Sequence, residues 1–194
     1  MQNTKTIPMQ HHEENPWHIN QSQEVYHNNW IQVIHHDVTH QSGKQGVYGV
    51  VHFKHYALGV VVFDETDRIC LVGQYRFPLN EYTWEIPEGG GKLNIDPLVS
   101  IQRELKEETG ITATDWKLIQ QLQLSNSATD EIAFLYTAKM VEQSAALPDQ
   151  DESIVHKMIP FEEAYQMVLD GKITDSLSVA AILKVKLMRL EKTL

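Results

Sequence analysis

A chain of 194 residues is long enough for one domain with a buried core and too short for two ordinary domains, so one active site is expected. Acidic residues outnumber basic ones by 26 to 16, and the net charge of -10 with His neutral argues against nucleic acid as a partner. The apolar stretches are far shorter than the roughly 20 residues that cross a bilayer, and no secretory signal is visible, so no membrane partner is expected and the expected location is the cytoplasm.

The N-terminal part of the chain, residues 1–55, is polar and holds nine of the ten histidines. Two short alternating runs, Trp30–Ile34 and Val47–Val51, flank a turn-forming segment at Ser42–Gly46. This pattern predicts a small antiparallel sheet preceded by a loose arm. The histidines have neither cysteine neighbours nor the helical His-Glu-x-x-His spacing of zinc sites, so no histidine metal site is expected.

A β-hairpin is predicted next, because the apolar runs Gly59–Phe63 and Ile69–Tyr75 flank a charged, turn-prone segment, Asp64–Arg68. The single cysteine, Cys70, lies in the second run and has no disulfide partner within the chain, so we expect it to pack in the core. Further strands are predicted at Trp84–Ile86, Leu118–Leu124, Ile132–Ala138 and Ile154–Ile159.

Three helices are predicted among these strands, at Pro97–Thr109, Phe161–Asp170 and Ser176–Leu190. Asp96 is a good N-cap for the first helix, and Pro97 fits its first position, where a missing N–H is harmless. The first two helices are each followed by a glycine, Gly110 and Gly171, at the usual place for a helix to end. Interspersed strands and helices in unequal numbers favour an α+β fold or a mixed sheet between helices.

The strongest signal of chemistry lies on the first of these helices. Glu104 and Glu108 are four residues apart and project side by side, with Glu107 on the adjacent edge. Neighbouring carboxylates repel each other unless a cation compensates, and Mg²⁺ favours a few carboxylates together with water and substrate phosphates. The hexapeptide alone is also compatible with a solvated, charged helix face.

The segment Gly89–Ile111 resembles the Nudix box, which reads Gly, five residues, Glu, seven residues, Arg-Glu-aliphatic-x-Glu-Glu-x-Gly-aliphatic. Every fixed position matches except one, because Ile95 stands where the box has its first Glu. Asp96 is the adjacent acid that could partly replace it. The resemblance implies an α+β Nudix fold, in which a mixed β-sheet is sandwiched between α-helices, here with a small N-terminal antiparallel β extension.

The resemblance also implies a role for each matching residue. Glu104 and Glu108 would be the principal metal ligands, Glu107 would assist, and the backbone carbonyl of Glu88 would complete the site. Arg103 would orient the carboxylates. The implied cofactor is Mg²⁺, with two or three ions taking part and Mn²⁺ able to substitute.

The resemblance extends beyond the box to the ADP-ribose pyrophosphatase branch of the family. The segments that carry it are Gly73–Pro78, Trp84–Gly90 and Gly171–Asp175. In that branch the N-terminal sheet pairs or swaps with a second subunit, so residues 1–55 are expected to promote a homodimer and residues 56–194 to form the Nudix domain. Trp30 or Tyr48 would stack on the adenine, unless it is a core or interface aromatic. Arg76 would face the substrate phosphates, unless it forms a structural ion pair.

The general base is expected in the loop Asp149–Glu152, from which this branch draws an acidic residue. Glu152 aligns best by its distance to the following strand, and Asp151 stays open as an alternative. Glu131 lies at another position where the branch carries an acid on the substrate or metal side; a solvated strand start is the alternative.

The implied reaction is attack of water on one phosphorus of ADP-ribose, which gives AMP and ribose 5-phosphate. GDP-mannose, another nucleotide sugar or a dinucleotide stays open as the substrate, because the box specifies only pyrophosphate cleavage. A module that binds a nucleotide without cleaving it is a third possibility, motivated by Ile95.

Overall fold

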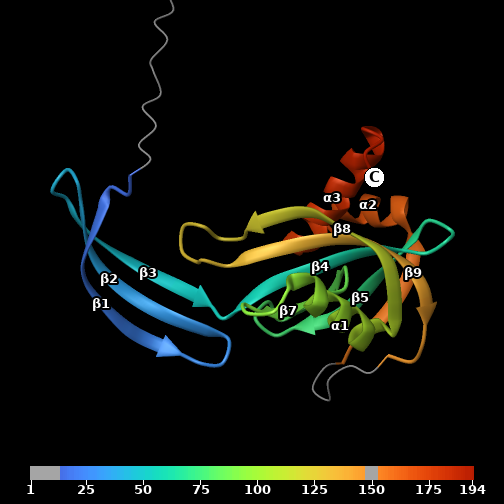
Figure 1. Ribbon diagram of the computed structural model, residues 1–194, viewed down its shortest axis with the longest axis horizontal. Helices are drawn as coiled ribbons and strands as arrows, with labels where there is room; N and C mark the ends of the chain where they lie inside the picture. The colour runs from blue at the N-terminus through green and yellow to red at the C-terminus, as the bar shows by residue number, and fades with distance from the viewer. Residues whose placement is uncertain (1–13, 147–152) are drawn as a thin grey trace, which may run out of the picture.

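The computed structural model describes residues 14–146 and 153–194, which form two β-sheets and three helices (Figure 1). In chain order the elements are β1 (Trp17–His27), β2 (Ile31–His40), β3 (Gln45–Phe53), β4 (His55–Phe63), β5 (Arg68–Arg76), β6 (Glu81–Glu85), β7 (Glu88–Lys92), α1 (Pro97–Thr109), β8 (Ile111–Gln123), β9 (Ile132–Gln143), β10 (Val155–Pro160), α2 (Phe161–Leu169) and α3 (Ser176–Leu190). None of these helices in the described part of the chain is long and apolar enough to span a bilayer.

The first three strands form a separate antiparallel sheet that projects from the body of the molecule (Figure 1). The small N-terminal sheet is therefore confirmed, but the loose arm is wrong for residues 17–27, which form β1. Nearly every side chain of β1 is exposed, so the strand has no apolar alternation that a sequence pattern could reveal. Backbone pairing with β2, interrupted by two register shifts, holds it in place.

The main sheet is mixed, as expected, with the strand order β10-β5-β4-β9-β8. β4 and β9 are parallel neighbours, whereas the other pairings are antiparallel. The glycine-rich segment before α1, for which no strand was predicted, forms β7 and pairs with β4 from His55↔Lys92 to Gly59↔Glu88. This pairing brings the start of the box beside the first residues of β4.

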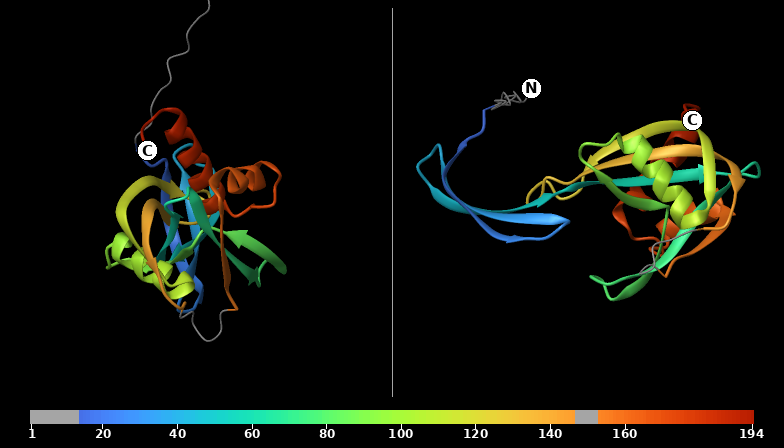
Figure 2. Two further views of the ribbon diagram at one scale, coloured as in Figure 1. Left: turned by 90° about the vertical axis from the view of Figure 1, so that its right-hand side faces the viewer. Right: turned by 60° about the horizontal axis from the view of Figure 1, so that its bottom comes forward.

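Helices cover both faces of the main sheet, α1 on one side and α2 and α3 on the other (Figure 2). Alternate residues of β4 divide between the two cores, since Val60 packs toward Leu105 of α1 and Val61 toward the α2–α3 side. Cys70 lies in the α1 core, as expected, and burial raises the pKa of its thiol to about 12, which makes it unreactive.

Gly110 follows α1 and Gly171 follows α2, and both have a positive φ, so substituting each by Ala tests whether a close contact adds to the strain at the end of α1. Gly110 has φ +70, and a Cβ there would lie 2.1 Å from the backbone oxygen of Ser144, whereas Gly171 has φ +68 and no atom within 4 Å. We expect Gly171→Ala to lower the free energy of unfolding by about 1 kcal/mol through backbone strain alone. Gly110→Ala should lower it by about 2–4 kcal/mol, because a backbone clash is added. Urea denaturation measures both, and equal losses would contradict the clash.

Candidate active site

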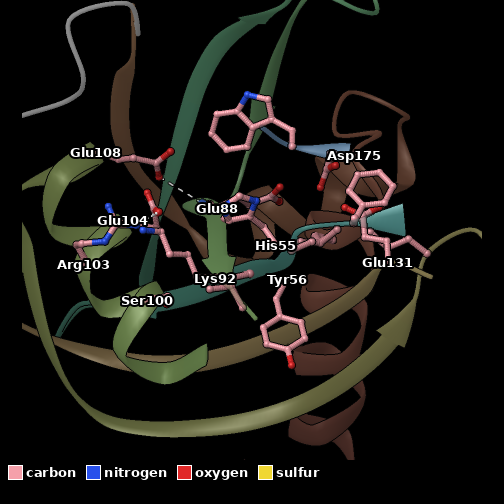
Figure 3. A pocket seen from close by; sticks show the side chains of 18 of the residues that line it. His55, Tyr56, Glu88, Lys92, Ser100, Arg103, Glu104, Glu108, Glu131 and Asp175 are labelled. Atoms are coloured by element: carbon pink, nitrogen blue, oxygen red, sulfur yellow. Dashed lines mark hydrogen bonds and ion pairs between the residues drawn. The ribbon is translucent and has the colours of Figure 1, made fainter. Parts of the chain in front are cut away.

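One cavity of ≈ 930 Å³ collects most of the residues singled out in the sequence. Its walls come from α1, β4, β5, β7, the start of α3 and the loop between β8 and β9, with Trp30 reaching it from the N-terminal sheet. Figure 3 shows acidic side chains distributed across it, with Glu104 and Glu108 on one side and Asp175 and Glu131 on the other. The cavity therefore brings together acidic side chains from distant parts of the chain.

Glu104 and Glu108 both face this cavity from α1 (Figure 3). Glu108 is only 6% exposed, and its Oε2 accepts a hydrogen bond of 3.2 Å from the backbone N–H of Glu88. The side chain of Glu104 packs directly against Gly89, where a Cβ would lie 2.3 Å from the Glu104 Cγ. The helix and the glycine segment thus form a single unit, and both carboxylates point into the cavity rather than into solvent.

Arg103 holds two of the helix acids at once. Its guanidinium donates at 2.5 Å to Glu104, the next residue, and at 2.5 Å to Glu107, four residues further along the helix. The side chain of Glu107 is 41% exposed and is not among the residues that line the cavity. Arg103 is thus placed to orient Glu104, while Glu107 lies on the exposed surface of the helix, outside the cavity.

Glu88 contributes more than the backbone carbonyl expected from the sequence. Its side chain turns away from α1 and accepts a hydrogen bond of 2.9 Å from the hydroxyl of Ser178. Burial raises the pKa of the Glu88 carboxyl well above its usual value, and the charge of Asp175 and a hydrogen bond with it raise the pKa further. Glu88 therefore holds a proton more readily than an exposed glutamate.

Residues at the start of α3 form hydrogen bonds with the segment around Ile86 and Glu88 and hold it in place. Asp175 caps the helix by accepting from the Ser178 N–H at 2.8 Å. The fully buried Ser178 hydroxyl accepts from the Ile86 N–H at 2.9 Å while it donates to Glu88. Ser178 was not predicted as a site residue, since its one local signal in the sequence is its position three residues after the helix N-cap Asp175.

Arg76 lines the cavity and also forms an ion pair. Its guanidinium makes two contacts of 3.1 Å and one of 2.5 Å with Glu85, a residue that is 2% exposed. Thr83 donates a further hydrogen bond to the same carboxylate. The structural ion pair considered from the sequence is therefore present, and it orients the arginine at the edge of the cavity.

Four ring side chains, Trp30, Phe53, His55 and Tyr56, also line the cavity. Trp30 lies over His55 with ring centroids 5.1 Å apart. Tyr48, the other aromatic considered for stacking, is not among the lining residues of this chain and instead packs edge-on against Trp17 at 5.4 Å. Within one chain, only Trp30 of the two candidates reaches the cavity.

Glu131 lies in the loop between β8 and β9 and also lines the cavity (Figure 3). Burial raises the pKa of its carboxyl, and the charge of neighbouring Asp130 raises it further. The half-buried Glu131 side chain therefore lines the cavity directly before β9 begins. The other candidate base, Glu152, falls outside the described residues, as does Asp151.

Comparisons with known families agree with this arrangement. Residues 53–178 match the NUDIX domain family. The chain belongs to the Nudix family. Residues 17–51, which cover most of the N-terminal sheet, match a second family, described as the nucleoside diphosphate sugar hydrolase N-terminal domain.

Relatives and a solved structure extend the comparison to most of the chain. An ADP-ribose pyrophosphatase of Bacillus subtilis (strain 168) is 29% identical over 164 residues, which cover 82% of this chain and 87% of the relative. A methanol dehydrogenase activator of Bacillus methanolicus is 34% identical over 128 residues, 65% of this chain and 69% of the relative. The crystal structure of an ADP compounds hydrolase superposes with a TM-score of 0.81 at 18% identity, over 93% of this chain and 98% of that chain, which confirms the Nudix fold.

The departure from the Nudix box is visible in the structure. Ile95 is 40% exposed and lines the cavity, where the box would place a carboxylate. Asp96 does not take over this position, because its side chain caps α1 by accepting from the Leu98 N–H at 2.9 Å. The acids of this Nudix site therefore come from α1, β7, α3 and the β8–β9 loop.

The donors of the site suit a hard divalent cation, the cofactor type of Nudix hydrolases. Among residues 14–146 and 153–194, no group of three or more His, Cys, Asp or Glu side chains is close enough to hold a metal ion. Two carboxylates, those of Glu104 and Glu108, do face the cavity. Mg²⁺ normally takes only one or two carboxylates from a protein and completes its shell with water and substrate phosphates, so this donor set fits it.

Proposed function

We propose that this Nudix protein hydrolyses the pyrophosphate bond of a nucleoside diphosphate sugar, with ADP-ribose as the preferred substrate and AMP and ribose 5-phosphate as the products. The observation that carries the proposal is a single cavity with the carboxylates of the Nudix helix at one side and a wall of aromatic rings at another. The first arrangement suits a diphosphate and the second a nucleobase. The match to a nucleoside diphosphate sugar hydrolase domain and the ADP-ribose pyrophosphatase relative support it.

Each side chain then has a defined task. Glu104 and Glu108, with the backbone carbonyl of Glu88, would hold Mg²⁺, which when bound neutralises the diphosphate and makes its phosphorus easier to attack. Arg103 keeps the Glu104 carboxylate in place, and the Glu88 N–H does the same for Glu108. Arg76, oriented by its ion pair with buried Glu85, would meet the remaining phosphate charge.

A general base must take a proton from the attacking water, and we propose Glu152 for this role, with Glu131 as the alternative within the cavity. The raised pKa of Glu131 brings it closer to neutral pH, where a base accepts and releases a proton most effectively. The variants Glu152→Gln and Glu131→Gln separate the two, since loss of the base lowers kcat while loss of a substrate contact raises KM.

A substrate panel tests the proposed function. ADP-ribose, GDP-mannose, a dinucleotide and ADP-glucose are each incubated with Mg²⁺, with Mn²⁺ and with a chelator, and the products are identified by mass spectrometry. AMP released from ADP-ribose only with a divalent cation supports the proposal, whereas faster cleavage of another substrate replaces ADP-ribose with that compound. Saturable ADP-ribose binding without turnover would instead support a Nudix-fold binding module.

Restoring the missing acid is expected to raise activity. Because Ile95 lines the cavity, Ile95→Glu adds a carboxylate to the cavity that holds Glu104 and Glu108. We expect kcat/KM to rise roughly tenfold, the lower end of the roughly 10- to 100-fold effects of groups that support metal ligands. Leu93→Glu is the matched control, because Leu93 is 51% exposed in the same segment and does not line the cavity. Equal kcat/KM values in the two variants would show that Ile95, in place of the first Glu of the box, does not lower activity.

We further propose that residues 1–55 form a dimerisation element, with a homodimer as the working unit. The N-terminal sheet has no helix packed on it within the described residues, yet it exposes several apolar side chains. They are Ile19, Val25, Tyr26, Val47 and Tyr48. A three-stranded sheet with uncovered apolar residues gains stability when a second surface buries them.

Val47 provides a test of this interface. It is 65% exposed within one chain, so Val47→Glu should be harmless to a monomer but should shift a dimer toward monomer, because the charge would be buried in the interface. Val141→Glu is the control, since Val141 is equally exposed at 65% but lies on β9 in the main sheet. Light scattering after size exclusion gives the molar mass; a monomeric wild type would contradict the proposal.

A further inference from the structure

His55 has an unusual environment for a polar side chain. It is the first residue of β4, and it lies where the N-terminal sheet meets the main sheet. Its Nδ1 atom is buried and makes no hydrogen bond, and no other side-chain nitrogen or oxygen in the described part of the chain shares this condition. Folding normally avoids such an atom, because its lost contact with water is not replaced. A buried group without a partner in a cavity wall is therefore an indication of function.

The neighbours of His55 determine from which side a ligand can reach it. On one side lies Gly90 of β7, near enough that an added Cβ would be 3.8 Å from the His55 Cβ, and this backbone is fixed by its pairing with β4. On the other side lies the Trp30 ring, tilted by 43° to the imidazole. Trp30 is 63% exposed, so few contacts hold its side chain. Of these two neighbours, the Trp30 side chain is the one that can move, so a ligand that displaces it gains access to the His55 ring.

The backbone of Trp30 is held firmly even though its side chain is not. Its N–H donates to the Asn28 side chain at 2.7 Å, and its carbonyl accepts from the Lys54 N–H at 2.9 Å. Rotation about the side-chain bonds can therefore move the indole from His55 without disturbing the hairpin. The indole would then be available for stacking at the mouth of the same cavity.

We propose that His55 selects the nucleoside half of the substrate: a nucleobase that stacks on Trp30 takes the indole away from His55, and the Nδ1 atom hydrogen-bonds the polar edge of that base. This inference rests on the proposed function and adds a specificity residue to it. The nucleobase is the part of the substrate that fits this place, because the surrounding wall is aromatic and the metal-binding acids lie on α1. The hydrogen bond that is absent in the free protein is then supplied by the ligand.

The test measures binding of AMP by calorimetry, with ribose 5-phosphate as a probe without a base. We expect His55→Leu to weaken AMP binding about tenfold, the effect of one lost hydrogen bond, and to leave ribose 5-phosphate binding unchanged. His55→Asn should restore most of the affinity, because its amide lies near the place of Nδ1, whereas His55→Gln, whose amide reaches the place of Nε2, should not. The thermal midpoint of His55→Leu should be equal to that of wild type or higher, because an unsatisfied polar atom is removed.

His156→Leu is the matched control. His156 lies on β10 outside the cavity wall, and its ring is hydrogen-bonded to Gln143 at 2.9 Å. This variant should lower the thermal midpoint and leave AMP binding unchanged. The inference about His55 would be overturned if His55→Leu bound AMP as tightly as wild type, or if His55→Gln rather than His55→Asn restored the affinity. In either case the proposed function would still stand if the wild type hydrolysed ADP-ribose. A wild type that neither binds AMP nor hydrolyses any nucleotide sugar overturns both.

Discussion

Glu108→Gln is expected to lower kcat for ADP-ribose by roughly 100- to 1,000-fold, the loss typical when one electrostatic group at a reacting centre is removed. The substitution keeps the shape of the side chain and an oxygen that can accept from the Glu88 N–H, so the fold should persist. What it removes is the negative charge of a carboxylate that is 6% exposed and faces the cavity. The cation would then be held mainly by Glu104.

AMP release by wild type and variant is measured over a range of Mg²⁺ and Mn²⁺ concentrations. The variant should need more metal for its half-maximal rate as well as losing rate at saturation. Glu163→Gln is the control, because Glu163 is an exposed glutamate on α2, away from the cavity, and its rate should match that of wild type. A Glu108→Gln protein that keeps more than a tenth of the wild-type rate, roughly 1.4 kcal/mol of barrier, would exclude Glu108 as a principal metal ligand.

The second large effect is expected from Gly89→Ala. A Cβ at this position would lie 2.3, 2.4 and 2.8 Å from Cγ, Cδ and Oε2 of Glu104. The clash is with a flexible side chain and not with backbone, so the protein should fold while the Glu104 carboxylate is pushed away from its place. We expect kcat to fall by roughly 100-fold, since a misplaced reacting or binding group of this kind can cost that much.

Gly90→Ala is the comparison that isolates this effect, because its Cβ would meet only His55, at 3.8 Å, an ordinary contact. Both variants add one methyl group to adjacent residues of β7, and both should unfold near the wild-type temperature. If Gly90→Ala loses as much activity as Gly89→Ala, a general intolerance of the strand to side chains, rather than displacement of Glu104, would account for the loss.

Local signals explain why α1 could be predicted with its boundaries. Asp96, Pro97 and Gly110 are specific to helix ends, and all three take the predicted positions. The spacing of Glu104 and Glu108 likewise placed both side chains on one face, and the structure turns that face toward the cavity. Such features depend only on residues close in sequence.

Features that depend on distant contacts were missed. β1 has polar residues on both faces, and β7 is mostly glycine, so each is a strand only because a neighbouring strand pairs with it. The Glu88 side chain could not be placed either, because its partner Ser178 is 90 residues away. His55 looked like one polar residue among many histidines until the structure showed its unpartnered nitrogen.

The hydrogen bonds that Ser178 makes with Ile86 and Glu88 can form only after most of the chain has been synthesised. The chain is synthesised from its N-terminus, so β7 and α1 emerge well before α3 is made. Until Ser178 arrives, the Ile86 N–H and the Glu88 carboxyl lack the hydroxyl that fixes them. A nascent chain can thus carry the complete Nudix box and still lack these hydrogen bonds in the pocket, which form only once α3 has been made.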